Sequence, residues 1–94
     1  MSYSPLLEEA LDLSTLLSAS KKLVLHNDDV NTFDWVIECL VTHCNHTEEQ
    51  ATQCAFITHY KGKCDVKLGD VEKLKDIRNS LELKGLSVTI ESNQ

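Results

Sequence analysis

The sequence predicts an α+β fold, a two-layer β-α-α-β-α-β sandwich in which a three-stranded antiparallel sheet carries helices packed on one face. Two observations predict it. Apolar or alternating segments typical of strands occur at 22–26, 64–68 and 86–91, and segments with helical periodicity separate them. The chain has 94 residues, of which 41% are apolar, as is normal for one small globular domain.

The segment 1–20 is expected to be an N-terminal extension of a core domain at 21–91. Apolar residues within 6–17 are spaced as in a short amphipathic helix, and Ser18-Ala19-Ser20 follows as a linker. They are Leu6, Leu7, Ala10, Leu11, Leu16 and Leu17. Such a helix could dock on the domain or on a partner. The extension lacks the basic and apolar blocks of a signal peptide, and no run of about 18 apolar residues could span a membrane.

The first strand, Lys22 to His26, is continuously apolar at its centre. The helix after it is expected to have Asn31 or Thr32 as its N-cap, because short polar side chains accept from the free N–H groups of a first turn. Its apolar residues recur with helical spacing and should form one buried stripe: Val36, Ile37, Leu40, Val41 and Cys44.

The second helix begins with a capping box, Thr47-Glu48-Glu49-Gln50, and Gly62 is its natural end. Its inward face combines Ala51, Cys54, Ala55 and Thr58.

The last third of the chain alternates strand, helix and strand. In the second strand Cys64, Val66 and Leu68 should point inward. Gly69-Asp70 opens the third helix and Lys84-Gly85 closes it, and Val71, Leu74, Ile77 and Leu81 lie on its inward face. In the third strand, Leu86, Val88 and Ile90 alternate with polar residues.

The formal net charge is −6, and Lys and Arg are spread out without a basic stripe. This pattern excludes nucleic-acid binding and permits cationic or amine-bearing partners. We expect a cytoplasmic monomer whose four cysteines are reduced thiols.

A polar cluster follows the first strand directly, at Asn27-Asp28-Asp29. Together with His59, near the end of the second helix, it offers acceptors to a small cation such as a protonated amine. The alternative is structural, because Asn and Asp often end strands and cap helices, and a histidine near a helix C-terminus is favoured by the helix dipole.

Two other chemistries have weaker support. Thiolate and imidazole ligands for zinc would come from Cys39, His43, Cys44 and His46, with Cys54 or Cys64, but no Cys-x-x-Cys pair is present. No flanking motif marks a catalytic cysteine, and three glycines do not make an oxyanion or phosphate loop. We therefore expect no metal, no cofactor and no enzymatic activity; a thiol-rich zinc-binding or other small protein-interaction module is the alternative function.

Four ordered motifs resemble the ClpS family, the adaptors that deliver N-end-rule substrates to a Clp AAA+ unfoldase. They begin at Lys22 (Lys-Leu-Val-Leu-His-Asn-Asp-Asp), Val36 (Val-Ile), Glu48 (Glu-Glu-Gln-Ala-Thr-Gln) and His59 (His-Tyr-Lys-Gly-Lys). The resemblance covers about residues 21–91.

The resemblance implies an adaptor that binds substrate proteins with a large apolar N-terminal residue (N-degrons). It implies that Asn27, Asp29 and His59 contact the α-amino group and that Asp28 supports the cluster or the peptide backbone. The side-chain pocket would be lined by Asn31, Phe33, Val36, Ala55, Thr58 and Leu86. The N-terminal domain of the Clp ATPase would contact Asp70 and Lys75, for which solvated surface charge is the alternative interpretation.

The sequence departs from the family's usual pattern beside the pocket. Most members have Asn-Asp-Asp-aromatic-Thr-Pro-Met after the first strand. In this chain Val30-Asn31-Thr32-Phe33 follows the Asn-Asp-Asp motif, so the proline is absent and Phe33 occupies the position of the methionine that gates the pocket. Ala55 and Thr58 stand where Met and Val are usual. Recognition of the amine is therefore a firmer expectation than any order of preference among side chains.

Overall fold

The computed structural model describes residues 20–93. Except for Ser20, the predicted extension and its helix lie outside the described residues. The elements in chain order are β1 (Lys21–His26), α3 (Phe33–Cys44), α4 (Glu48–Lys61), β2 (Lys63–Gly69), α5 (Val71–Leu83) and β3 (Ser87–Ser92). The predicted order β-α-α-β-α-β is confirmed.

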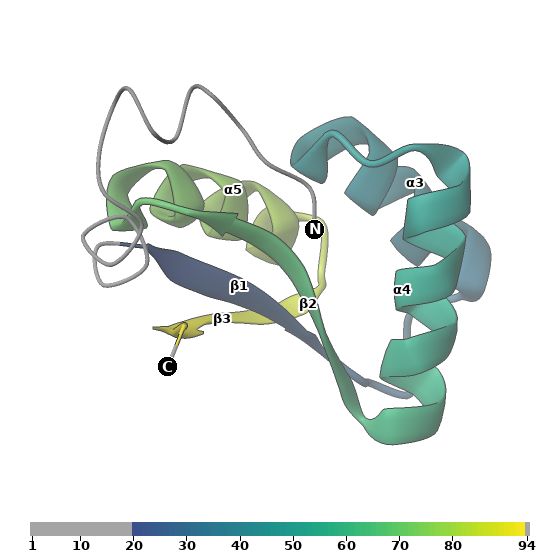
Figure 1. The fold of residues 1–94 in the computed structure, drawn as a ribbon. Helices are drawn as coiled ribbons and strands as arrows, with labels where there is room; N and C mark the ends of the chain where they lie inside the picture. Colours follow the sequence, from purple (N-terminus) through teal and green to yellow (C-terminus); the bar gives the residue numbers. More distant parts are fainter. Residues whose placement is uncertain (1–19, 94) are drawn as a thin grey trace.

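The three strands form one antiparallel sheet in the order β2-β1-β3, so β1 is central and pairs with both neighbours (Figure 1). In the register, Leu25 of β1 lies opposite Cys64 of β2 and Val88 of β3. Helix α5 lies across one face of the sheet, and α3 and α4 form a pair beside it (Figure 1). This is the predicted α+β fold.

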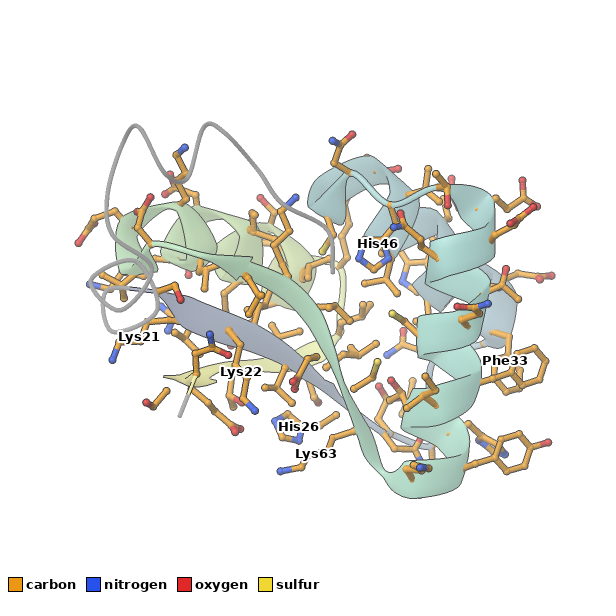
Figure 2. The ribbon with its side chains drawn as sticks, viewed as in Figure 1. Lys21, Lys22, His26, Phe33, His46 and Lys63 are labelled. Carbon is orange, nitrogen blue, oxygen red and sulfur yellow. The ribbon has the colours of Figure 1, made fainter. Side chains whose placement is uncertain are left out.

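The hydrophobic core lies between this face of the sheet and the helices. Leu23 and Leu25 of β1 point into it, whereas Lys22, His26 and Lys63 lie on the opposite side of the sheet from α5 (Figure 2). On that opposite face Val24, which lies between Lys22 and His26 in β1, is also fully buried. The core is formed by these buried residues: Leu23, Leu25, Cys39, Leu40, Cys44, Ala51, Val66, Leu74, Leu81, Leu86 and Val88.

Helix α3 begins after Thr32, whose hydroxyl accepts a 3.1 Å hydrogen bond from the N–H of Trp35. Of the two N-caps considered, Thr32 is therefore the one used. The predicted buried stripe was wrong at Val41, which is 39% exposed, while Cys39 is buried. Because α3 contacts α4 on one side and α5 on the other, its buried face is rotated toward Cys39.

Helix α4 starts with the predicted capping box. The Thr47 N–H donates to the Gln50 side chain at 2.9 Å, and the Gln50 N–H donates to the Thr47 hydroxyl at 3.1 Å. The helix ends at Gly62, whose φ of 92° is in the left-handed region that glycine adopts without a steric penalty. Both ends of α4 agree with the sequence, and they hold His59 in its last turn.

In β2 the side chains do not alternate strictly between the inward and the outward face of the sheet. The pairing with β1 shifts between Leu23 and Val24, where Val66 is the extra residue of a β-bulge. Beyond the bulge the side chains of β2 lie on the opposite faces of the sheet from those that strict alternation predicts. Lys67 therefore points inward and its Nζ donates to the Cys44 carbonyl at 3.1 Å, whereas Leu68 is 59% exposed. The inward orientation predicted for Leu68 was therefore wrong.

Helix α5 is capped by Asp70, whose carboxylate accepts from the Lys73 N–H at 3.0 Å. Leu74 and Leu81 are buried as expected, and Ile77 packs partly buried against the core. Val71, which was expected to face inward, is exposed because it begins the helix at the end of the sheet.

Candidate functional site

The candidate site is built where β1 ends beside the last turn of α4. The Asn27 N–H donates to the Gly62 carbonyl at 2.9 Å, and the Gly62 N–H donates to the Thr58 carbonyl at 2.9 Å. These two bonds tie the exit of β1 to the end of α4. His59 and Asn27, 32 positions apart in the sequence, thereby lie around one cavity.

Asp28 organises the loop between β1 and α3. Its Oδ1 accepts from the N–H groups of Val30 and Asn31, each at 2.8 Å, and its Oδ2 accepts from the Asn31 side-chain amide at 2.9 Å. This is an Asx-type turn, in which a carboxylate replaces backbone partners. Asp28 therefore has a structural task in this loop.

The same loop is held against the turn between α5 and β3. The Asn31 side-chain amide donates to the Gly85 carbonyl at 2.9 Å, and the Trp35 Nε1–H donates to the Lys84 carbonyl at 3.0 Å. Asn31 thus uses both of its amide hydrogens, one on Asp28 and one on Gly85. These contacts hold the loop in a defined position.

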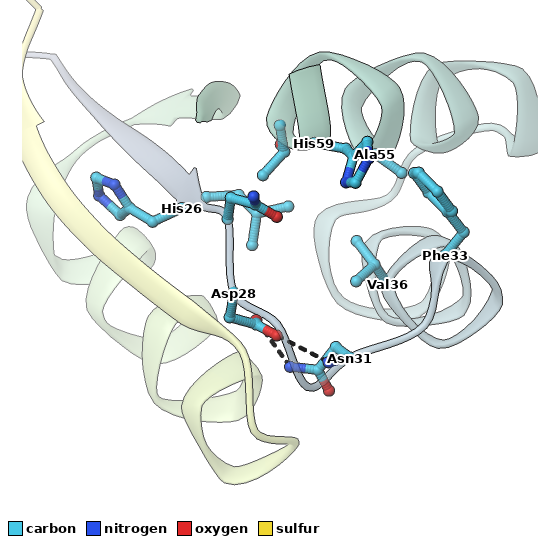
Figure 3. A pocket seen from close by; sticks show the side chains of 10 residues that line it. His26, Asp28, Asn31, Phe33, Val36, Ala55 and His59 are labelled. Carbon is cyan, nitrogen blue, oxygen red and sulfur yellow. Dashed lines mark hydrogen bonds between the residues drawn. The ribbon is translucent and has the colours of Figure 1, made fainter. Parts of the chain in front are cut away.

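Between this loop, α3 and α4 lies a cavity that encloses about 60 Å³. Figure 3 shows Asp28 and Asn31 at one end and Phe33, Val36 and Ala55 at the other. The volume is far below the roughly 300–1,000 Å³ typical of pockets for whole small molecules, so the cavity suits a single side chain. Its lining residues are Leu25, His26, Asn27, Asp28, Asn31, Phe33, Val36, Ala55, Thr58 and His59.

Eight of the predicted site residues thus surround one cavity, and two do not line it. Leu86 is buried in the core. Asp29 is exposed, and it forms no hydrogen bond or ion pair with the residues that the structure describes. Its carboxylate is therefore available to an incoming group, in contrast to that of Asp28.

Electrostatics at the polar end favour a cation. Partial burial of Asp28 raises its pKa, but the hydrogen bonds from Asn31 and Val30 outweigh burial and hold the pKa below the ordinary value of 3.8. The carboxyl group is therefore ionised at neutral pH. The C-terminal end of α4, where His59 lies, adds the negative pole of a helix dipole.

The predicted ATPase-contact residues lie on α5, away from the cavity lining. Asp70 has a structural task as the N-cap of α5. Lys75 is half exposed and lies 3.7 Å from the Glu72 carboxylate. Both side chains are at the surface, where a partner could reach them.

The cysteines do not form a metal or nucleophile site in the part of the chain from 20 to 93. No group of three His, Cys, Asp or Glu side chains in that part could hold a metal ion. Burial raises the pKa of the Cys44 thiol to about 11 and that of Cys64 to about 12. Thiolate is the form that attacks substrates, so these two thiols are poor nucleophiles at neutral pH.

Two features near the cavity were not predicted from the sequence. His26 is among the lining residues, but its ring points away from the cavity (Figure 3) and its Nε2 lies 2.8 Å from the Thr89 hydroxyl. The aromatic residues Phe33, Phe56 and Tyr60 gather beside the cavity mouth. A spacing of four positions on α4 predicts that Phe56 and Tyr60 are neighbours, but it does not predict the third ring.

The model of one protein family, "ATP-dependent Clp protease adaptor protein ClpS", matches residues 18–89. The chain belongs to the ClpS family. The ClpS proteins are adaptors, which confirms the expectation that the chain is not an enzyme. Their interaction with the Clp protease follows from the same description.

Curated ClpS adapters from several bacteria are similar to the chain. The Edwardsiella ictaluri protein is 32% identical over 77 residues, which cover 80% of this chain and 73% of that protein. The Thermosynechococcus vestitus protein is 32% identical over 68 residues, covering 71% and 72%. The Shewanella halifaxensis protein is 35% identical over 57 residues, and the alignment spans 61% of this chain but only 56% of that ClpS.

A solved ClpS structure has the same fold. Agrobacterium tumefaciens ClpS2, in a complex with L-phenylalaninamide, superposes with a TM-score of 0.73 at 19% sequence identity, covering 79% of this chain and 96% of ClpS2. In residues 20–93, none of the helices is both long and apolar enough to cross a bilayer.

Proposed function

We propose that the chain binds the free N-terminus of proteins whose first residue is large and apolar, and that it delivers them to a Clp AAA+ unfoldase. The observation that carries the proposal is a single cavity whose lining combines polar side chains, Asn27, Asp28 and His59, with apolar ones such as Val36 and Ala55. An N-terminal residue carries a charged amine and a side chain on the same carbon atom, so it offers one group to the polar side chains and another to the apolar ones.

At the polar end, the protonated α-amino group would donate to the Asn27 side chain, the Asp29 carboxylate and a ring nitrogen of His59. Asp28 supports this end indirectly, since its carboxylate holds the loop and its negative charge remains nearby. Each charge-assisted hydrogen bond contributes about 1.5–3 kcal/mol net. Two or three of them are sufficient to distinguish a free amine from a blocked one.

At the apolar end, the first side chain would enter between α3 and α4. Ala55 and Thr58 are buried on the α4 side, and Val36 lies on the α3 side. Phe33 stands at the mouth, where its ring contacts the His59 ring with centroids 5.2 Å apart. L-Phenylalaninamide, the ligand bound to ClpS2, has the free amine and apolar side chain that this arrangement requires.

The test is a series of peptides that differ only in the first residue: Leu, Phe, Trp, Ala or Asp. We expect Leu and Phe to bind at least tenfold more tightly than Ala or Asp, because burying a large apolar side chain contributes about 1.5–3 kcal/mol. Fluorescence anisotropy measures the affinities, and a peptide with the leucine moved to its fourth position is the control. Equal affinities across the series would contradict the proposal.

For delivery, we propose that the N-terminal domain of the Clp ATPase contacts the α5 surface through Asp70 and Lys75. Replacing Asp70 by Asn removes the charge but keeps a good N-cap. We expect Asp70→Asn to weaken binding of the isolated ATPase domain about threefold or more in calorimetric titration, with no change in melting temperature. Asp76→Asn, on the same helix, is the control, and equal effects of the two variants would refute a specific role for Asp70.

The net charge of −6, together with four free cysteines in the described residues, also supports action in the reducing cytoplasm, as a monomer. Sedimentation velocity across a range of concentrations tests the monomeric state, which a concentration-dependent dimer would contradict.

A further inference from the structure

Three aromatic side chains form a continuous exposed surface beside the cavity. We call Phe33, Phe56 and Tyr60 the aromatic strip. The ring centroids of Phe33 and Phe56 are 5.0 Å apart, and the nearly parallel rings of Phe56 and Tyr60 are 6.2 Å apart. Their exposed fractions are 38%, 46% and 75%. The chain has only five Phe, Trp and Tyr residues, so three of them are concentrated in this strip.

The strip is not needed to build the core. Helix α4 buries Ala51, Ala55 and Thr58 on its inward face, and it holds Phe56 and Tyr60 toward solvent. Phe33 lies on the outer side of the α3–α4 pair, away from the sheet (Figure 2). Contiguous exposed apolar surface is uncommon on small monomeric domains and marks interaction sites.

The position of the strip indicates its occupant. Phe33 lines the cavity and also belongs to the strip, and His59 lines the cavity while its ring contacts both Phe33 and Tyr60. The strip is therefore continuous with the cavity wall. A peptide whose first side chain fills the cavity must leave through the mouth, and in an extended chain each further residue advances about 3.3–3.6 Å. The second and third residues therefore lie within reach of the strip.

We infer that the aromatic strip is a subsite for the second residue of the bound N-terminal segment and that it prefers an apolar or aromatic side chain there. The inference rests on the proposed function. Aromatic side chains pack favourably edge-to-face or offset-stacked at centroid distances of about 4.5–7 Å, and the rings of the strip already have this spacing. A second-residue Phe would extend the array, whereas Ala would leave it in water.

The test compares two peptides, Leu-Phe-… and Leu-Ala-…, that are otherwise identical, each with a free and with an acetylated N-terminus. On the unmodified protein we expect the free Leu-Phe peptide to bind about three- to tenfold more tightly than the free Leu-Ala peptide. In Phe56→Ala and in Tyr60→Ala the ratio of the two affinities should fall toward one. Leu83→Ala, which removes an exposed leucine of α5 outside the strip, should keep the full ratio.

The outcomes separate the two proposals. Equal, acetylation-sensitive binding of both peptides, or an unchanged ratio in Phe56→Ala, would overturn the second-residue subsite and leave the proposed function standing. Binding that is insensitive to acetylation would overturn both. Formation of a dimer that Phe56→Ala abolishes would assign the strip to a second copy of the chain. Circular dichroism of each variant verifies that the fold is intact, and Phe56→Leu provides a milder substitution if Phe56→Ala does not fold.

Discussion

Acetylation of the N-terminus of a Leu-first peptide is expected to lower its affinity for this protein by about a hundredfold. Acetylation removes the positive charge and leaves one N–H where the ammonium had three. Loss of one or two charge-assisted hydrogen bonds costs about 3 kcal/mol, which corresponds to roughly a factor of a hundred in the dissociation constant. Fluorescence anisotropy with labelled peptides measures the difference, and equal affinities would exclude recognition of the amine.

The protein side of the same contact is tested by His59→Ala. We expect this variant to bind the free peptide about tenfold less tightly, because one acceptor of the ammonium is lost, and to bind the acetylated peptide as the unmodified protein does. His43→Ala is the matched control, since His43 lies on α3 and does not line the cavity. His59 is exposed, so the melting temperature should stay the same; a large decrease would indicate a structural role instead.

Replacing Asp28 by Ala is expected to lower the free energy of unfolding by about 1–2 kcal/mol, whereas Asp29→Ala should leave it unchanged. The two residues are adjacent and have the same charge, but the Asp28 carboxylate accepts three hydrogen bonds from Val30 and Asn31. For a domain of this size the melting temperature should fall by about 4–8 °C for each kcal/mol. Thermal unfolding followed by circular dichroism at pH 7 measures both variants.

The effect of Asp28 also has a predicted pH dependence. Its pKa is lowered in the folded state from 3.8, so its contribution to stability is fully present above pH 3.8 and is lost as the pH falls through the lower folded value. The difference between the unmodified protein and Asp28→Ala should therefore be constant near neutral pH and should shrink below about pH 4. Equal stability of the unmodified protein and Asp28→Ala at pH 7 would show that the turn does not depend on this carboxylate.

Local signals in the sequence were reliable because their partners are close in the chain. The Thr47–Gln50 capping box, the Asp70 cap and the left-handed Gly62 each involve residues within about four positions, and backbone geometry alone determines such contacts. The wrong predictions concern residues whose orientation depends on packing. Val41 is exposed because α3 is rotated between two other helices, and Leu68 is exposed because the bulge at Val66 exchanges the faces of β2.

The candidate site shows the same division. The sequence identified the polar cluster after β1, His59 and most of the residues that surround the cavity, since the motifs of a family preserve them together. It left two interpretations of Asp28 and Asp29 open, a structural one and an amine-binding one. The structure distinguishes the pair, because only Asp28 has Asn31 as a partner, and Asn31 is itself held by Gly85, 54 positions away.

By itself, then, the sequence determined the order of the elements, their caps and the chemistry collected at the end of β1. The tertiary structure alone decided which carboxylate builds the loop and which remains available, how small the cavity is, and that rings from α3 and α4 join in one strip. The physical reason is the distance along the chain between interacting residues. Caps and turns depend on neighbouring peptide groups. The face on which a side chain lies depends instead on strand register and helix rotation, which the packing of the whole core determines.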